Sequence, residues 1–271
     1  DNFLISLKAE LVKANFSEYE IIIVNDGSKD ETLKILKDNN ILNEIKILDN
    51  YINKGYGSSI KRGIVNSKFD TIVIVDIDGT YPAKDVPEAI KKYFDHDNKK
   101  NNIDMVVAQR TGKYYRESFI KSFLRLILKF VVEWSSGNKI PDINSGLRVF
   151  SKETITPFLP RLSNAFSFTS TITLAMHIEG LKVSYIPIDY HARIGSSSIK
   201  PIQDTLRFFS LVLRTVMYFK PLQVFGTLGL TMLTLAIVVG FAGRAFLGEV
   251  PDVVALSLFS TGTVFVGLGL L

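Results

Sequence analysis

The chain has 271 residues, 46% of them hydrophobic, with 32 Lys and Arg against 27 Asp and Glu. This length accommodates one large domain or two small ones, and the lack of cysteine excludes a disulfide scaffold and any site built on a thiolate. The charges are concentrated before residue 221, because residues 221–271 contain only Arg244, Glu249 and Asp252. The first 220 residues therefore carry 31 basic and 25 acidic groups, a net charge of +6.

The first 110 residues alternate between predicted strands and helices. Short apolar runs rich in β-branched residues predict strands at 20–25, 44–48, 71–75 and 104–108. The segments around them predict helices at 3–13, 29–38, 58–67 and 85–94, and a further strand is expected at 182–190. This alternation is typical of an α/β fold with a mostly parallel sheet and helices on both faces.

Two longer helices are expected after residue 110. Residues 116–134 have a face of apolar side chains beside a basic stripe of Lys121, Arg125 and Lys129. Residues 202–219 repeat this pattern. Two interpretations stay open: amphipathic helices packed on the protein core with solvated charges, or helices that lie in the interface of a lipid bilayer.

Two uncharged segments end the chain. Residues 222–243 and 253–271, with lengths of 22 and 19 residues, form helices of about 33 and 28 Å, the thickness of a bilayer core. Two buried helices of a soluble protein are the alternative, which the short separation of nine residues disfavours. We therefore expect a transmembrane hairpin. The preceding basic residues Arg207, Arg214 and Lys220 predict that the larger part of the chain lies on the cytoplasmic face.

Polar clusters follow three of the predicted strands, at the sheet edge where open α/β folds bind their ligands. The first cluster is residues 25–30 (NDGSKD). An Asp at position 26 can accept hydrogen bonds from the N–H groups of a nucleotide base. The same segment also suits an ordinary strand–turn–helix connection with Ser28 as the N-cap.

The second cluster is Asp76 and Asp78, directly after the strand at 71–75. Two carboxylates one residue apart, on a turn that leaves a buried strand, can converge on one hard cation and its diphosphate. Such a spacing also arises by chance, as at Asp95 and Asp97 in a run of Lys, Asn and Asp that indicates a solvated loop. The buried strand before Asp76 makes the first pair the better candidate.

The third cluster is basic. Arg110 follows the strand at 104–108, and residues 193–200 (RIGSSSIK) follow the strand at 182–190. A Gly/Ser loop between Arg193 and Lys200 suits phosphate, because its backbone amides and cations can close over an anion. A plain linker into the next helix is the competing interpretation.

Together these segments resemble glycosyltransferase family 2, and within it the polyprenyl-phosphate glycosyltransferases similar to dolichol-phosphate mannose synthase. The resemblance covers nearly all of residues 1–220, in the family's order. The matching segments are NDGSKD (25–30), NKGYGSSIKRGI (53–64), DIDGTYP (76–82), AQR (108–110), DINSGLRVF (142–150) and RIGSSSIK (193–200), followed by the paired apolar segments.

The resemblance implies a GT-A fold and a nucleotide-sugar donor, a UDP- or GDP-hexose. It implies that Mg²⁺ or Mn²⁺ is held by Asp76 and Asp78. The donor-binding residues that it implies are Asp26, Lys54, Gly55, Asp76, Asp78 and Arg110.

The resemblance also implies the reaction, an inverting transfer of the sugar to a polyprenyl phosphate in the bilayer. The implied acceptor- and phosphate-binding residues are Asp142, Asn144, Ser145, Arg193, Ser197 and Lys200, and the implied catalytic residues are Asp78, Arg110 and Arg193. No nucleic-acid partner is expected, and a homo-oligomer is compatible with the sequence.

The chain departs from the family pattern at three places. The family's opening strand lies outside it, and the missing initiator Met and the apolar run continuing to Leu271 suggest a piece of a longer protein. Thr80 stands where mannose synthases often have a metal-binding Gln, so the sugar and base stay open. Ser197 and Ser198 replace the family's Ser-Lys, which leaves the role of Lys200 open.

The expected domains are a catalytic domain at 1–200, a juxtamembrane amphipathic helix at 201–220 and two transmembrane helices at 221–271. A haloacid-dehalogenase-type phosphohydrolase with Asp76 as nucleophile is the alternative function, but the sequence has no late Gly-Asp-x-x-x-Asp after residue 110. A processive polysaccharide synthase is a further alternative, which requires the motif Gln-x-x-Arg-Trp. The single tryptophan, Trp134, follows Val-Val-Glu, so the sequence lacks that motif.

Overall fold

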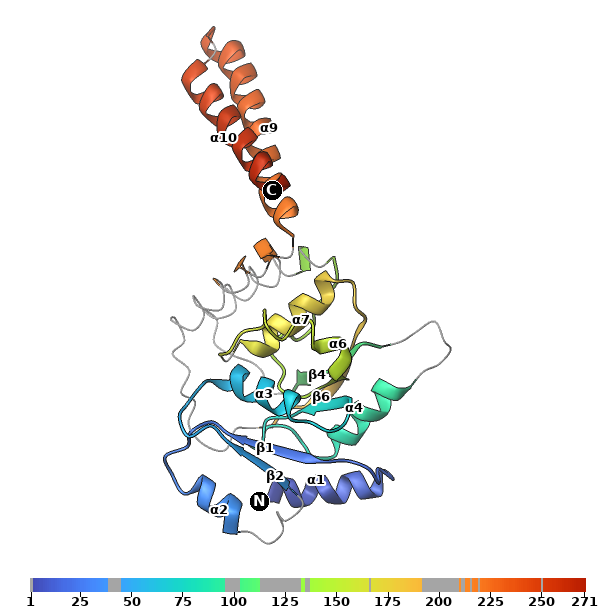
Figure 1. The fold of residues 1–271 in the computed structure, drawn as a ribbon. Helices are drawn as coiled ribbons and strands as arrows, with labels where there is room; N and C mark the ends of the chain where they lie inside the picture. The colour runs from blue at the N-terminus through green and yellow to red at the C-terminus, as the bar shows by residue number, and fades with distance from the viewer. Residues whose placement is uncertain are drawn as a thin grey trace. The chain divides into compact units, whose positions relative to one another are not determined.

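The computed structural model describes residues 2–38, 45–95, 103–112, 133–134, 137–165, 167–191, 210, 213–214, 216–218, 220–249 and 251–271. The chain divides into two compact units, Asp1–Phe209 and Ser210–Leu271 (Figure 1). The predicted helices at 116–134 and 202–219 fall largely outside the described residues, as does the loop at 193–200.

The first unit is a mixed α/β structure, as predicted. Its strands are β1 (Ile21–Asn25), β2 (Ile45–Asp49), β3 (Thr71–Ile74), β4 (Met105–Thr111), β5 (Arg148–Ser151) and β6 (Val183–Asp189). Its described helices are α1 (Asn2–Lys13), α2 (Thr32–Asp38), α3 (Tyr56–Val65), α4 (Asp85–Phe94), α6 (Lys152–Ile155) and α7 (Phe168–Ile178).

The strands form two sheets. β1 and β2 pair in parallel, with Ile21 opposite Ile45 and Asn25 opposite Asp49. The second sheet has the order β3-β5-β4-β6, in which β4 and β6 are parallel and β5 is antiparallel to both of its neighbours. β3, β4 and β6 therefore run in one direction, so the residues that follow them leave the sheet at the same edge.

The central strand β5 corrects the prediction of a mostly parallel sheet without a strand near residue 150. It is four residues long and begins with Arg148, so its sequence lacks an unbroken apolar run. The Arg148 side chain is nonetheless fully buried, because polar atoms around its guanidinium satisfy it. A charged residue is expected at the surface unless the fold places hydrogen-bond partners around its charged group.

The start of α2 is also corrected, from residue 29 to Thr32. The carboxylate of Asp30 accepts a hydrogen bond from the Thr32 backbone N–H at 3.1 Å, as a helix-capping side chain does. Ser28 is not the N-cap, because α2 begins four residues after it; its own N–H donates to the Asn25 side chain at 3.3 Å. The other strands and helices predicted before residue 110, and the strand predicted at 182–190, match described elements to within about three residues.

Helices cover both faces of the β1–β2 pair (Figure 1). On one face Leu4 of α1 and Leu36 of α2 pack with Ile45 and the neighbouring isoleucines. On the other face α3 approaches closely, so that a Cβ at Gly63 would lie 3.5 Å from Val24. The alternation of side chains along the strands produces this two-sided burial.

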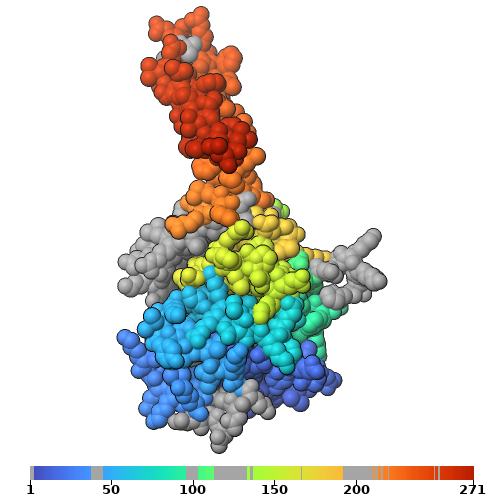
Figure 2. All heavy atoms as spheres, viewed as in Figure 1, coloured from blue at the N-terminus to red at the C-terminus, as the bar shows by residue number. Residues whose placement is uncertain are grey.

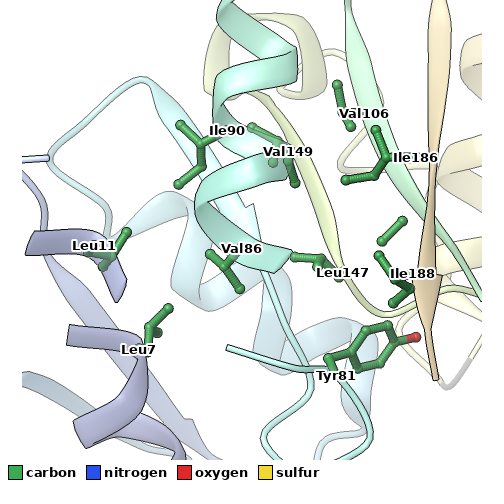
Figure 3. Close-up of a cluster of buried hydrophobic side chains, with 12 residues drawn as sticks. Leu7, Leu11, Tyr81, Val86, Ile90, Val106, Leu147, Val149, Ile186 and Ile188 are labelled. Carbon is green, nitrogen blue, oxygen red and sulfur yellow. The ribbon is translucent and has the colours of Figure 1, made fainter. Parts of the chain in front are cut away.

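The larger core lies between α4 and the four-stranded sheet (Figure 3). Val86 and Ile90 of α4 lie between α1 and the strands, and Val106 of β4 and Val149 of β5 are fully buried. Tyr81 lies at the border of this core and the candidate site. The core therefore fixes the loops that follow β3 and β4.

The main elements of the second unit are α9 (Pro221–Leu247) and α10 (Asp252–Leu270), which pack along each other as a narrow pair (Figure 2). Their backbones approach at glycines: a Cβ at Gly229 would lie 2.8 Å from the Gly262 carbonyl oxygen. Both helices are long and apolar enough to cross a membrane, and only 11% of the apolar window of each is buried. Small residues at a helix contact with apolar side chains outward are typical of membrane helices.

Candidate active site

The carboxyl ends of β1, β2 and β3 are joined by polar contacts around α3. Asp26 follows β1, Asn50 follows β2 and Asp76 follows β3 by two residues. The first turn of α3 contacts both carboxylates, Asp26 through the Gly55 backbone and Asp76 through the Tyr56 hydroxyl. The sequence prediction that Asp26 and Asp76 belong to one region is thus supported by the fold.

The Asp26 carboxylate is held by the loop at 50–55. One of its oxygens accepts hydrogen bonds from the Lys54 N–H and the Asn50 side-chain amide, and the other accepts from the Gly55 N–H, all at 2.9 Å. Burial acts to raise the pKa of Asp26, but these hydrogen bonds together with one from Ser59 outweigh it and hold the pKa below its ordinary value. Asp26 is therefore ionised and fixed in orientation.

Two residues around Asp26 were missed by the sequence analysis. Asn50 is 3% exposed and its amide also donates to Ser59 at 2.9 Å, while its oxygen accepts from Arg62. Arg62 donates in addition to the Asp49 carbonyl oxygen at 2.6 Å. The polar residues directly after the strand at 44–48 were the signal that could have identified Asn50.

Asp76 lies between α3 and the loop before β5. The Tyr56 hydroxyl donates a hydrogen bond to one carboxylate oxygen of Asp76 at 2.9 Å. A Cβ at Gly146 would lie 2.1 Å from the other oxygen, so a larger residue at this position would displace the Asp76 carboxylate. Burial and the adjacent Asp76 charge raise the pKa of Tyr56, which keeps its hydroxyl a donor.

Asp78 is held by the turn that follows it. One of its carboxylate oxygens accepts a hydrogen bond from the Thr80 hydroxyl at 2.5 Å and from the Thr80 N–H at 3.2 Å. Thr80 is completely buried, and its carbonyl oxygen accepts from the His191 N–H at 3.0 Å. Thr80, noted in the sequence as a departure from a metal-binding Gln, therefore orients Asp78 in this chain.

The residues 142–148 wrap around Tyr81. The Gly146 N–H donates to the Tyr81 hydroxyl oxygen at 2.5 Å, and the Ser145 hydroxyl lies 3.4 Å from it. Burial raises the pKa of Tyr81 to about 12. The Arg148 guanidinium donates to the Ser145 carbonyl oxygen at 2.8 Å. This loop is thus fixed from both sides.

Arg110 is paired with Asp142. Its Nε and one terminal nitrogen donate to the two carboxylate oxygens at 2.8 and 2.9 Å, and its backbone N–H donates at 3.1 Å. The Asp142 side chain is 1% exposed and that of Arg110 18% exposed. The guanidinium carbon also lies 5.4 Å from the centre of the Tyr190 ring. This bidentate geometry fixes the plane of the guanidinium.

The structure distributes the predicted acceptor residues unevenly. Asp142 and Ser145 are buried, whereas Asn144 is exposed, although all three make hydrogen bonds within the protein. Arg193, Ser197 and Lys200 lie outside the described residues. The acceptor contacts predicted for these six positions stay predictions.

The donor set at Asp76 and Asp78 fits a cation that also binds a diphosphate. Both side chains are partly exposed, and Gly146 leaves the space that a larger residue would take beside Asp76. Among the described residues, no group of three or more His, Cys, Asp or Glu side chains is placed to hold a metal. Mg²⁺ commonly takes one or two carboxylates and completes its shell with phosphate oxygens and water.

Solved structures with a similar fold include glucosyl-3-phosphoglycerate synthase from Mycobacterium tuberculosis in complex with phosphoglyceric acid. It is 14% identical, with a TM-score of 0.58 over 79% of this chain and 74% of that one. A complex of the same enzyme with Mn²⁺, UDP-glucose and phosphoglyceric acid has a TM-score of 0.54 at 13% identity, over 76% and 74%. The likeness confirms the predicted GT-A-like fold.

Curated relatives include a dolichyl-phosphate beta-glucosyltransferase of Dictyostelium discoideum, 27% identical over 205 residues, which are 72% of this chain and 62% of the relative. The chain thus spans less than two thirds of that protein. An undecaprenyl-phosphate 4-deoxy-4-formamido-L-arabinose transferase of Pseudomonas fluorescens (strain SBW25) is 24% identical over 274 aligned positions, 94% of this chain and 74% of the relative. A family model described as Glycosyl transferase family 2 matches residues 3–155. Because this match covers more than half of the sequence, the chain belongs to glycosyl transferase family 2.

Proposed function

We propose that this protein transfers a sugar from a nucleotide diphosphate donor to a polyprenyl phosphate in the membrane. The observation that carries the proposal is the arrangement around α3, whose first turn contacts both Asp26 and the Asp76 carboxylate. The names of the curated relatives, both of which specify a polyprenyl-type phosphate, support the acceptor class. The two apolar helices of the second unit suit such an acceptor.

In this proposal the nucleotide-sugar donor binds across the carboxyl ends of β1 and β3. Asp26 contacts the base with help from Lys54 and Gly55, and Asp76 and Asp78 hold a divalent cation on the diphosphate. Mg²⁺ or Mn²⁺ supplies stabilisation of the negative charge that develops on the departing nucleoside diphosphate. The hydrogen bonds that orient both carboxylates support this assignment, because an oriented ligand loses less entropy on binding.

The acceptor needs little acid–base chemistry. A lipid phosphate has a second pKa near ~6 and is an anionic nucleophile at pH 7. Its oxygen attacks the anomeric carbon as the bond to the nucleoside diphosphate breaks, which inverts that centre. Arg110, oriented by Asp142, together with Arg193 and Lys200 offsets the repulsion between the two anions.

A donor screen tests this function. The full chain in detergent micelles is incubated with a short polyprenyl phosphate, Mg²⁺ or Mn²⁺ and a panel of UDP- and GDP-sugars, and the lipid product is resolved chromatographically. We expect one nucleotide class to give a glycosylated lipid phosphate and Asp78→Asn to abolish it. Release of inorganic phosphate without a lipid product would instead favour the phosphohydrolase alternative.

The proposal includes a topology, in which residues 1–220 are cytoplasmic and residues 221–271 form a membrane hairpin. The chain has no native cysteine, so single cysteines report their position without background. One cysteine replaces Lys13 of α1, whose side chain is 77% exposed, and the other replaces Glu249 in the exposed turn between α9 and α10. The two single-cysteine variants should react with an impermeant reagent from opposite sides of a vesicle. Labelling of both from one side contradicts the hairpin.

A further inference from the structure

Tyr56 occupies the first position of α3, and the proposed function gives its side chain no role of its own beyond the contact with Asp76. Its hydroxyl donates to Asp76 at 2.9 Å, while the neighbouring Gly55 N–H donates to Asp26 at 2.9 Å. Two successive residues therefore hold the two carboxylates to which the base and the diphosphate are assigned. This places Tyr56 where it can affect the diphosphate end of the site without touching the reacting atoms.

We propose that Tyr56 is a positioning residue, which holds the Asp76 carboxylate in the orientation that binds a divalent cation together with a nucleoside diphosphate. The inference rests on the proposed function and names one further residue of the same site. The phenol restrains one carboxylate oxygen, and the close backbone of Gly146 limits movement of the other. Asp76 is thus held between a donor and a steric stop.

The chemistry of a phenol suits this role. A phenol hydroxyl can donate one hydrogen bond, and that of Tyr56 donates to one oxygen of the Asp76 carboxylate at 2.9 Å. Partners of this kind, which orient a metal-binding side chain, change metal affinity by about 10–100-fold when they are removed.

The position of α3 does not depend on this hydroxyl. The Ser58 N–H donates to the Asn164 carbonyl oxygen at 3.0 Å, and the Lys61 ammonium donates to the Leu162 carbonyl oxygen at 2.5 Å and to the Asn164 side chain at 2.7 Å. A Cβ at Gly57 would lie 2.2 Å from the Ser163 carbonyl oxygen, which shows how closely the helix meets this loop. Tyr56→Phe therefore removes one hydrogen bond and leaves the helix in place.

The test measures cation binding separately from turnover. Mn²⁺ is titrated into the full chain in micelles with saturating UDP, and in parallel with GDP, and free Mn²⁺ is followed by electron paramagnetic resonance. We expect Tyr56→Phe to weaken Mn²⁺ binding at least about 10-fold, while binding of the metal-free nucleotide changes less than about twofold. Tyr185→Phe is the matched control: it removes a phenol hydroxyl on β6 that lies 3.1 Å from Nε2 of His177 on α7, and it should leave Mn²⁺ affinity unchanged.

The outcomes separate this inference from the function on which it rests. If the parent chain binds Mn²⁺ in a nucleotide-dependent way and Tyr56→Phe binds it with the same affinity, the proposed role of Tyr56 is wrong but the proposed function stands. A parent chain that binds no Mn²⁺ with either nucleotide overturns the metal assignment of the proposed function as well. An equal loss of metal affinity in Tyr185→Phe would show a general effect of losing a phenol, and it too would overturn the inference.

Discussion

Replacing Arg148 with Met should lower the stability of the first unit substantially, although Arg148 touches no proposed substrate. Its guanidinium is fully buried and donates to the carbonyl oxygens of Ser145 at 2.8 Å and Ile143 at 2.9 Å, and to the Thr173 hydroxyl at 2.5 Å. All three acceptors are neutral. Met is similar in length and apolar, so the substitution removes the donors while it keeps most of the packing.

The magnitude follows from two opposed terms. Three hydrogen bonds from a charged donor contribute about 1.5–3 kcal/mol each, about 5–9 kcal/mol together. Removing a buried charge returns several kcal/mol of desolvation cost. The net loss is therefore about 3 kcal/mol, which for a unit of this size corresponds to a decrease of about 6–12 °C in the midpoint of thermal unfolding.

The assay is thermal unfolding of the full chain in micelles, followed by the fluorescence of Trp134 and by circular dichroism. Arg161→Met, at an exposed position, is the matched control and should shift the midpoint by less than about 2 °C. A decrease of less than about 2 °C for Arg148→Met would show that water or a rearranged loop replaces the guanidinium. The reasoning from buried acceptors would then be wrong.

Two further predictions concern the same region. Gly146→Ala places a Cβ 2.1 Å from an Asp76 oxygen and should abolish nucleotide-dependent Mn²⁺ binding while the protein stays folded. The control is Gly267→Ala, which has open space around its Cβ and should bind Mn²⁺ like the parent chain. Normal Mn²⁺ binding by Gly146→Ala would refute the steric argument. Burial and the Arg148 charge lower the pKa of His177 to about 4, so the folded protein binds fewer protons than the unfolded chain between about pH 4 and 6.5 and loses stability as the pH falls through that window. His177→Gln should reduce the difference in unfolding midpoint between pH 7 and pH 5, and an unchanged difference would contradict this assignment.

The local patterns of the sequence were sufficient for the first half of the catalytic unit. The apolar, β-branched runs that became β1, β2 and β3 are long enough to predict strands, and the polar residues after them mark where each strand leaves the sheet. Asp26 and Asp76 could therefore be assigned to one edge of the fold. The two apolar segments near the end of the chain were equally clear, because length and composition alone predict such helices.

The contacts that make a site of these residues could not be read from local patterns. Asp142 pairs with Arg110 across 32 residues, and the Tyr56 hydroxyl reaches Asp76 across 20. Each contact depends on how two elements pack, which the periodicity of neither element encodes. The sequence therefore supplied the carboxylates as candidates, and only packing showed which groups orient them.

The central strand β5 shows the difference most clearly. Its first residue, Arg148, predicts an exposed position by its charge, yet it is fully buried on a strand that is antiparallel to both of its neighbours in the sheet. Whether a charge is buried depends on the acceptors brought around it, here from residues 143, 145 and 173. The sequence by itself determined the α/β class, the strand ends and the apolar helices, because these follow from local periodicity. The tertiary structure alone decided β5, the Arg148 cluster and the orientation of Asp76, because these arise from contacts between segments far apart in the chain.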